Sequence, residues 1–353
     1  MNEKIVTINI PRKSVFNKWK DFLTAQGITN FSQEEVTNID STIAIFDSDH
    51  QLQATGSVAG NVLKYIAVAA EQKEGGAVFN QIVTTLLSEL AQRQIFHVFV
   101  FTKPQYSESF QHVGFSELAR SKFGVILEEG DSTVKDYLSS IPKIFDQDNK
   151  KVSAIVMNAN PFTYGHHFLA QTAAKENDLV YVFVVNTNAS LFNTKERMQM
   201  VQEGLKDLAN VKVVNGSDYM VSYATFPAYF LKTEDEAIQY QTTLDARIFR
   251  DQIAPPLNIT KRYLGTEPVS HTTGIYNQVL KKELPPAVKP VIIERKHTSS
   301  GRLITATEVR AQIKEGKIDE IRKLVPQSTF KFIEDNEKEL TTRIKKGMKI
   351  SGN

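Results

Sequence analysis

The fold is decided by residues 151–185, KVSAIVMNANPFTYGHHFLAQTAAKENDLVYVFVV. The stretch begins with an apolar run, Val152–Met157, which predicts a buried strand. A loop follows, and the side chains from His166 to Ala174 then recur at helical spacing before a second apolar run, Leu179–Val185. The order strand, loop, helix, strand predicts a β-loop-α-β unit of a parallel sheet. In such a sheet, ligands bind where this loop lies.

The loop between the first strand and the helix has the features of a phosphate site. Pro161 restricts the backbone and favours an extended Asn160, and Gly165 lets another group approach the backbone closely. His166 then stands at the start of the helix, where unpaired N–H groups and the helix dipole favour an anion. An ordinary strand-to-helix turn with an incidental histidine gives the same short pattern, so the rest of the chain has to decide.

Composition narrows the class of protein. Lysine and arginine total 42 and aspartate and glutamate total 40, so the net charge of +2 gives no global field that would favour nucleic acid. The first residues lack the apolar core of a signal peptide, and no apolar run is long enough to span a membrane. The absence of cysteine excludes disulfides, cysteine zinc sites and a covalent cysteine intermediate. We therefore expect a soluble, cytoplasmic protein that binds neither nucleic acid nor membrane.

A second candidate binding loop lies in the first part of the chain. Val62–Ala69 predicts a strand, Val78–Gln92 predicts a helix, and Gln72-x-x-Gly75-x-Ala77 lies between them. Glycines at such a place let successive N–H groups point at a diphosphate. A plain turn at the two glycines is the alternative.

This loop, followed by Phe110-x-x-x-Gly114-Phe115, resembles the GNAT acetyltransferases. The resemblance implies a GNAT-like α+β domain over residues 1–145. It also implies that a CoA-like arm binds at the loop, through Gln72, Lys73, Gly75, Gly76 and Ala77.

Two more segments after residue 150 carry candidate phosphate and nucleoside groups. Asn193 is expected to cap a helix on which Lys195 and Arg197 could neutralise phosphate charge, although surface cations on a solvated helix would look the same. A predicted strand, Lys261–Leu264, ends in Gly265-Thr266-Glu267-Pro268. A glycine and a carboxylate at a strand end suit the recognition of ribose or adenine.

The segment RLITATEVR, residues 302–310, predicts another capped helix. Thr305 can cap it while hydroxyls and N–H groups, including those of Ala306 and Thr307, face phosphates. Arg310 can bridge two phosphate oxygens. The alternative is a capped helix with no ligand.

Two of these segments resemble signatures of the nucleotidyltransferase superfamily. Asn160-Pro-Phe-Thr-Tyr-Gly-His166 is similar to His-x-Gly-His, with Thr163 where most members have the first histidine. Ile304-Thr-Ala-Thr-Glu-Val-Arg310 is similar to Ile-Ser-x-Ser/Thr-x-x-Arg. The Asn-Pro-Phe-Thr-x-Gly-His variant, preceded by a GNAT-like domain, resembles the citrate lyase ligase family. The fold class implied is α/β: the GNAT-like domain, then a Rossmann-like nucleotidyltransferase domain with a parallel sheet over 150–330. A charged tail, 331–353, is expected to be a solvated helix that frays.

The resemblance implies an acid–thiol ligase. It would activate acetate with ATP as acetyl-adenylate and acetylate the thiol of the CoA-like prosthetic group on citrate lyase acyl carrier protein, releasing AMP and diphosphate. Mg²⁺ is expected to accompany ATP. The implied catalytic residues are His166, at the α-phosphoryl group, and Arg310, which would hold the diphosphate with Lys195, Arg197 and Thr307. The implied ATP-binding residues are Asn160, Pro161, Phe162, Thr163, Gly165, His166, Lys195, Arg197, Gly265, Thr266, Glu267, Thr305, Ala306, Thr307 and Arg310.

Two other functions stay open from the sequence. One is an adenylyltransferase of cofactor biosynthesis with a non-catalytic CoA-binding domain. The other is an amine N-acetyltransferase activity in the first domain. The nucleotide product separates the first from the ligase, and ATP-independent use of acetyl-CoA would reveal the second.

Overall fold

A computed structural model describes residues 4–70, 76–186, 190–220, 234–266, 271–297, 301–348 and 350. Four predicted site residues, Gln72, Lys73, Gly75 and Glu267, lie outside these ranges. The chain divides into two compact units: Met1–Tyr137 with Phe226–Leu244, and Leu138–Thr225 with Asp245–Asn353. The sequence did not predict that residues 226–244 would belong to the first unit.

The first unit contains a seven-stranded sheet in the order β1-β2-β3-β4-β5-β7-β6. Its strands are β1 (Lys4–Thr7), β2 (Ser41–Phe46), β3 (Leu52–Ala59), β4 (Val62–Val68), β5 (His97–Thr102), β6 (Ser116–Arg120) and β7 (Val125–Gly130). Neighbouring strands are antiparallel except β4 and β5, which pair in parallel through only Val62 with Phe99 and Leu63 with Val100. The two strands therefore share a ladder at one end only.

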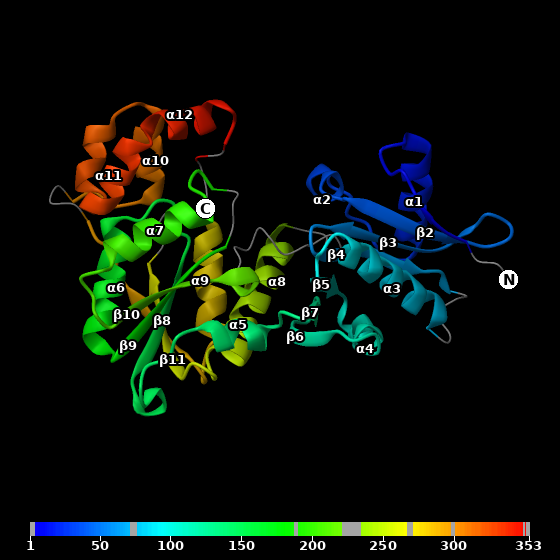
Figure 1. Cartoon of the computed structure of the whole chain (residues 1–353), viewed down its shortest axis with the longest axis horizontal. Coiled ribbons are helices and arrows are strands. Elements are labelled where there is room, and N and C mark those ends of the chain that lie inside the picture. The colour runs from blue at the N-terminus through cyan, green and yellow to red at the C-terminus, as the bar shows by residue number, and fades with distance from the viewer. Residues whose placement is uncertain are drawn as a thin grey trace. The chain divides into compact units, whose positions relative to one another are not determined.

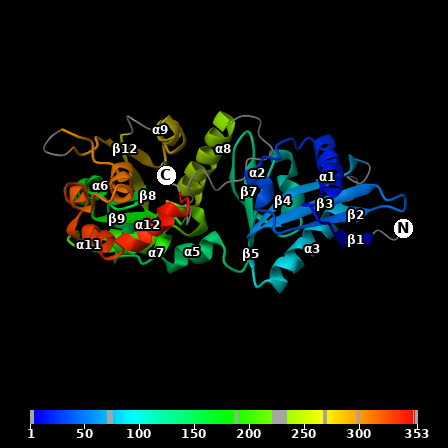
Figure 2. The ribbon, with the colours of Figure 1, turned by 90° about the horizontal axis from the view of Figure 1, so that it is seen from above.

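Helices cover both faces of this sheet. They are α1 (Lys13–Ala25), α2 (Gln33–Thr37), α3 (Ala77–Gln92), α4 (Ser107–Gln111) and a 3₁₀ turn (Pro104–Tyr106). Figure 2 shows α1 and α3 on opposite faces. The apolar residues of α3 recur every three or four positions, so Ile82, Leu86 and Leu90 are all buried against the sheet. On the other face, Trp19 of α1 packs against Tyr65 of β4.

The second unit contains a five-stranded, wholly parallel sheet in the order β10-β9-β8-β11-β12. Its strands are β8 (Val152–Met157), β9 (Leu179–Val184), β10 (Val211–Asn215), β11 (Ile259–Gly265) and β12 (Lys289–Ile293). Every residue of β9 is buried, as expected for a near-continuous apolar strand covered on both faces.

The helices of the remaining chain are α5 (Val134–Ser140), α6 (Tyr164–Glu176), α7 (Thr194–Gly204), α8 (Glu234–Arg247), α9 (His271–Glu283), α10 (Ala306–Lys314), α11 (Gln327–Asp335) and α12 (Glu337–Lys345). A π-helix, Ile248–Ile253, continues α8, and 3₁₀ turns occur at Gln147–Asn149, Ser217–Tyr219 and Ile318–Lys323. One core joins α6, α7, α10 and α11 to a single face of the parallel sheet. On the opposite face, Phe249 of the π-helix contacts Phe183 of β9. The predicted fold class, an α+β part followed by a Rossmann-like parallel sheet, is therefore confirmed.

The strand order of the parallel sheet indicates where a ligand binds. From the central strand β8 the chain proceeds to β9 and β10 on one side, and then crosses to β11 and β12 on the other. In open parallel sheets, ligands occupy the crevice at the carboxyl ends of the strands where the order reverses. Here the reversal lies between β8 and β11, so the loop after Met157 and the end of β11 at Gly265 flank the candidate site.

The C-terminal residues differ from the expected solvated, fraying helix. Figure 1 shows α10, α11 and α12 grouped beside α7, and both α11 with α7 and α12 with α10 are in contact. Ile333 and Leu340 are fully buried at 0% and 1% exposure. The prediction was wrong because the charged residues occupy the outer face, while a stripe of apolar residues packs onto the parallel-sheet unit.

Candidate active site

The start of α6 is built by a reciprocal cap. The backbone N–H of Thr163 donates to Nδ1 of His166 at 3.0 Å, and the N–H of His166 is 3.4 Å from Oγ1 of Thr163. Because Nδ1 accepts a hydrogen bond from a backbone N–H, it carries no proton, and the ring proton of the neutral histidine is on Nε2. The cap thus fixes both the ring and its tautomer.

His166 stays uncharged at neutral pH. Burial, and secondly the positive charge of Arg295, lower the pKa of His166 from 6.5 to about 4. Its ring stacks on Phe162, with centroids 5.7 Å apart and planes 20° from parallel. His166 therefore offers a fixed, neutral N–H donor at the first turn of a helix, where an anion is favoured.

The residues before the cap hold the loop in place. Asn160, Pro161 and Phe162 are all buried. The side-chain oxygen of Asn160 accepts from the N–H of Phe192 at 3.3 Å. Phe162 fills the core so closely that a Cβ on Gly204 would lie 2.4 Å from its ring. These predicted ATP-binding residues therefore hold the loop in place through contacts on its buried side.

Arg197 differs from its predicted contact with the diphosphate. Its side chain is fully buried. The guanidinium donates to the backbone oxygens of Phe192, Asn158 and Val185 and to the side chains of Asn158 and Thr194, at 2.8 to 3.1 Å. Arg197 therefore binds the ends of β8 and β9 to the start of α7, and these acceptors enclose its charge.

Arg310 also differs from its predicted place on the diphosphate. It is fully buried, and its Nη1 donates to the backbone oxygen of Asn160. Its Nε donates to the backbone oxygen of Ile350 at 2.7 Å and its Nη2 to Oγ1 of Thr307 at 3.1 Å. The side chain braces the loop that leads to His166.

Lys195 was predicted to neutralise phosphate charge, and that role stays a prediction. The residue is exposed on the first turn of α7, directly after the loop that follows β9. In the part of the chain that the structure describes, no ion pair involves Lys195. The ammonium group can therefore reach an anion at the carboxyl end of the sheet.

Replacing Lys195 by methionine is expected to raise the KM for a phosphate-bearing substrate about threefold to tenfold, because an exposed cation contributes a modest charge interaction. The free energy of unfolding should change by less than about 0.5 kcal/mol. Lys206→Met, at an exposed lysine beyond the end of α7, is the matched control. An unchanged KM in Lys195→Met would remove this residue from the site.

The two predicted signature segments meet in space. Thr305 caps α10 by accepting from the N–H of Glu308 at 3.1 Å, and Ala306 is the first residue of the helix. A Cβ on Gly165 would lie 3.5 Å from the backbone oxygen of Ile304, so the first turn of α6 lies against the residue before this cap. The N-termini of α6 and α10 are therefore neighbours, and Thr307 is exposed beside them.

Sequence reasoning missed a basic pair after β12. The backbone N–H and Nε of Arg295 donate to Oγ1 and the backbone oxygen of Thr266, at 3.2 and 2.6 Å, just after Gly265. The ammonium group of Lys296 lies 5.6 and 5.8 Å from the ring centroids of Tyr164 and Phe168 on α6. Two cations directly after the last parallel strand were the available signal, because the carboxyl ends of all five strands share one edge.

Replacing Arg295 by methionine is expected to raise the pKa of His166 above about 4, because the charge that disfavours the imidazolium is lost. In the wild type, the unfolded chain binds the proton of His166 more tightly than the folded chain. The free energy of unfolding therefore falls progressively as pH drops from about 6.5 to about 4, because protonation of His166 favours the unfolded chain. Titration of the histidine ring signals by NMR gives the pKa of His166 in the wild type and in Arg295→Met. Arg302→Met, at an exposed arginine, is the control, and an unchanged pKa in Arg295→Met would contradict the assignment.

Comparison with known proteins gives the family. The model described as citrate lyase ligase C-terminal domain matches residues 152–333. The [Citrate [pro-3S]-lyase] ligase of Escherichia coli (strain K12) is 34% identical over 318 residues, covering 87% of this chain and 90% of that protein. This chain belongs to the citrate lyase ligase family. The ligase of the same name from Haemophilus influenzae is 32% identical over 317 residues, covering 87% of this chain and 94% of that protein. The family is one of enzymes, because its members are named as ligases.

Solved structures match parts of the chain at low scores. An acyl-CoA N-acyltransferase from Pseudomonas aeruginosa is 10% identical and covers 36% of this chain and 100% of that chain, with a TM-score of 0.30. An acetyltransferase of the GNAT family from Staphylococcus aureus Mu50 is 9% identical and covers 36% of this chain and 98% of that chain, also with a TM-score of 0.30. Because these TM-scores are low, the fold of the first unit is inferred from its own seven-stranded sheet.

Membrane-spanning helices and metal-ligand clusters are both absent from the described residues. Among them, no helix combines the length and apolar character needed to cross a membrane. Nor do the described side chains include a cluster of three histidines, aspartates or glutamates that could hold a metal ion.

Proposed function

We propose that this protein activates acetate with ATP and passes the acetyl group to the thiol of the CoA-like prosthetic group on citrate lyase acyl carrier protein. AMP and diphosphate are the other products. The single observation that carries the proposal is the meeting of the N-termini of α6 and α10, with His166 as a neutral donor, at the reversal of strand order in the parallel sheet. The names of the relatives support citrate lyase as the protein acted on.

In the first half-reaction an acetate oxygen attacks the α-phosphorus of ATP. The bond from that phosphorus to the bridging oxygen breaks, and diphosphate leaves with the electron pair. Such a transfer needs positioning and charge stabilisation more than covalent help. Nε2–H of His166 and the N–H groups of the α6 N-terminus would donate to the α-phosphoryl oxygens. Lys195 would neutralise the departing diphosphate.

Mg²⁺ is proposed as a companion of ATP. Such an ion usually takes most of its ligands from phosphate oxygens and water, with one or two protein carboxylates. Because the described residues include no cluster of three histidines, aspartates or glutamates that could hold the ion, its oxygen ligands would come mainly from the phosphates and water. The ion would supply further neutralisation of the diphosphate.

In the second half-reaction the thiolate of the prosthetic group attacks the acetyl carbon, and the bond to the AMP oxygen breaks. We propose that the first unit binds the prosthetic arm, through Gln72, Lys73, Gly75, Gly76 and Ala77. The conformation of Gly76 supports this binding site, because Gly76 precedes α3 as the N-cap with a φ of +67° and Ala77 begins the helix. The ladder between β4 and β5 ends after Leu63, so backbone groups further along β4 have no partner from β5 among the described residues. The amides of an extended arm could pair with them.

One incubation tests the proposal. The protein is given ATP, acetate and a CoA-type thiol, and the nucleotide and acyl products are identified. AMP, diphosphate and an acetyl thioester in equal amounts are expected. Incorporation of the AMP group into a dinucleotide would instead indicate an adenylyltransferase. Transfer from acetyl-CoA to an amine without ATP would indicate an N-acetyltransferase.

A further inference from the structure

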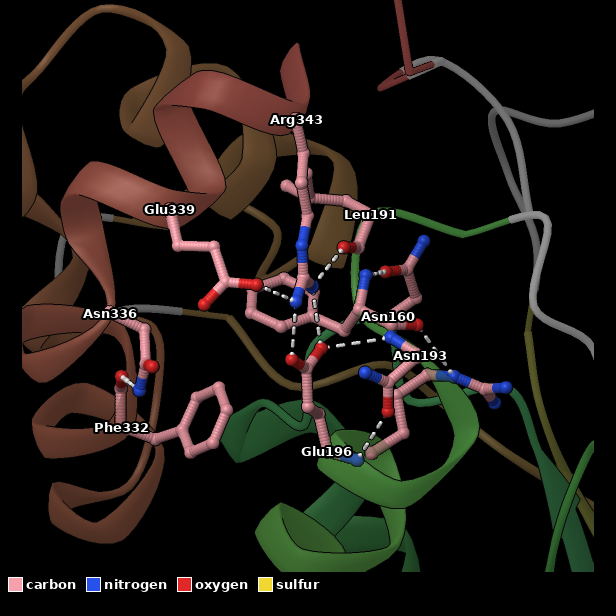
Figure 3. A network of polar contacts seen from close by, with 10 residues as sticks. Asn160, Leu191, Asn193, Glu196, Phe332, Asn336, Glu339 and Arg343 are labelled. Carbon is pink, nitrogen blue, oxygen red and sulfur yellow. Dashed lines mark hydrogen bonds and ion pairs between the residues drawn. The ribbon is translucent and has the colours of Figure 1, made fainter. Parts of the chain in front are cut away.

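The last described residues of the chain contact the candidate active site. Arg343 of α12 forms two parallel hydrogen bonds to the carboxylate of Glu196 on α7, at 2.7 and 2.8 Å. It also donates to the backbone oxygen of Leu191 at 3.1 Å. Figure 3 shows this guanidinium between the two elements. The pair is part-buried, with side-chain exposures of 21% and 17%, so it is screened less than an ion pair on the surface.

The contacts continue from Glu196 to the loop of His166. Glu196 accepts from the N–H of Asn193 at 2.9 Å, and Asn193 caps the helix in return. The preceding N–H in the chain, that of Phe192, donates to the side chain of Asn160 at 3.3 Å. Figure 3 shows the path from Arg343 to Asn160. Only four residues separate Asn160 from Gly165, so the path ends at the loop that presents the histidine.

The same loop is also held from the other side. The backbone oxygen of Asn160 accepts from Arg310, whose Nε donates to the backbone oxygen of Ile350. The C-terminal segment, residues 336–350, therefore contacts the path to Asn160 at two points, Arg343 and Ile350. Both residues lie beyond the stretch that matches the family model, which ends at residue 333.

We infer that Arg343 is a positioning residue for ATP, and that the C-terminal segment completes the ATP site. Through its contacts with Glu196 and Leu191, Arg343 fixes the residues at the start of α7. These residues include Lys195, and the N–H of Phe192 just before them holds the side chain of Asn160. Loss of Arg343 leaves the carboxylate of Glu196 unpaired and the carbonyl of Leu191 without this donor. This inference rests on the proposed function, because it assumes that the loop and the first turn of α7 bind the phosphates.

The test separates the two half-reactions. Arg343→Gln is compared with the wild type in acetate-dependent exchange of diphosphate with ATP, and in transfer from supplied acetyl-adenylate to the thiol. The KM for ATP in the exchange is expected to rise about tenfold, in keeping with the loss of a charged hydrogen bond. Transfer from acetyl-adenylate should stay within about twofold of the wild type, because that step binds no diphosphate. Arg343→Lys should recover much of the ATP affinity, since it keeps the charge beside Glu196.

A matched control is available near α11. Arg322 forms exposed ion pairs with Asp319 and Glu334 and lies over the ring of Phe330, and among the described residues it has no ion pair or hydrogen bond to the loop or α7. Arg322→Gln should leave both half-reactions unchanged. If Arg343→Gln does not fold, Glu196→Gln removes the same ion pair while its amide oxygen can still accept from the N–H of Asn193. The same separation of KM and transfer is then expected.

Two results would overturn the inference: a normal KM for ATP in folded Arg343→Gln, or an equal loss in both half-reactions. The second would mean that Arg343 only supports the fold. A wild-type protein without acetate-dependent exchange would refute the proposed function instead. In that case calorimetric titration with ATP decides the inference alone: weaker binding by Arg343→Gln upholds it, and equal binding refutes it.

Discussion

Replacing His166 by alanine is expected to slow acetate-dependent exchange of diphosphate with ATP by about 10²- to 10³-fold, the usual loss for one donor aimed at developing charge. The donor is oriented twice over, by the N–H of Thr163 on Nδ1 and by stacking on Phe162. Its low pKa keeps the ring neutral at neutral pH, with the proton on Nε2. The variant should still fold, because removal of this cap costs about 1 kcal/mol.

The neighbouring histidine provides a matched control. His167 is one position further along α6, and its Nε2 lies 3.2 Å from a carboxylate oxygen of Asp207, which is 57% exposed. His167→Ala should retain normal exchange and lose less than about 1 kcal/mol of stability. Near-normal exchange by folded His166→Ala would refute the assignment of the donor. An equal loss in both variants would show that the start of α6, and not one side chain, matters.

Replacing Arg197 by methionine is expected to lower the free energy of unfolding by about 3–5 kcal/mol, the range for breaking a buried, charged network. The substitution leaves the backbone oxygens of Asn158, Val185 and Phe192 without their donor. Each of these carbonyls ends a segment that borders the candidate site. The unfolding midpoint in urea, with an unchanged slope, measures the loss.

Lys195→Met, two positions earlier on the same helix, is the control for this effect. It should leave stability nearly unchanged and weaken ATP binding, which is the reverse of the result expected for Arg197→Met at a temperature where that variant is folded. If Arg197→Met is as stable as the wild type but binds ATP poorly, then the arginine contacts the diphosphate as the sequence predicted, and its enclosure by carbonyls is not its main role.

The sequence alone predicted the elements around the site because their signals are local. Val152–Met157 forms a strand with the predicted bounds. The two predicted helix caps, Asn193 and Thr305, both accept from a backbone N–H three residues on. Thr163, which was not predicted as a cap, does the same before α6. Capping depends on a short polar side chain immediately before a helix, and strand formation on a run of apolar residues, so neither needs knowledge of the distant chain.

Only the tertiary structure decided which cations can reach a ligand. Lys195 and Arg197 are two positions apart and look alike in the sequence, but one is exposed and the other fully buried. Positions two apart on a helix point about 200° from each other, and which direction faces the core depends on how α7 packs on the sheet. Arg310 was also predicted at the diphosphate, and its burial likewise could not be foreseen from the sequence. Its acceptors, Asn160 and Ile350, are far from it along the chain.

The sequence by itself determined the family and the β-loop-α-β unit, and it placed two nucleotidyltransferase-like signatures in one parallel-sheet domain. It did not determine the contacts of Arg295 with Thr266 or of Arg343 with Glu196. A charge in a sequence shows no partner, because an ion pair depends on distance and burial, and these are set only when distant segments pack. The tail was therefore expected in solvent, whereas its buried apolar stripe brings Arg343 to the start of α7.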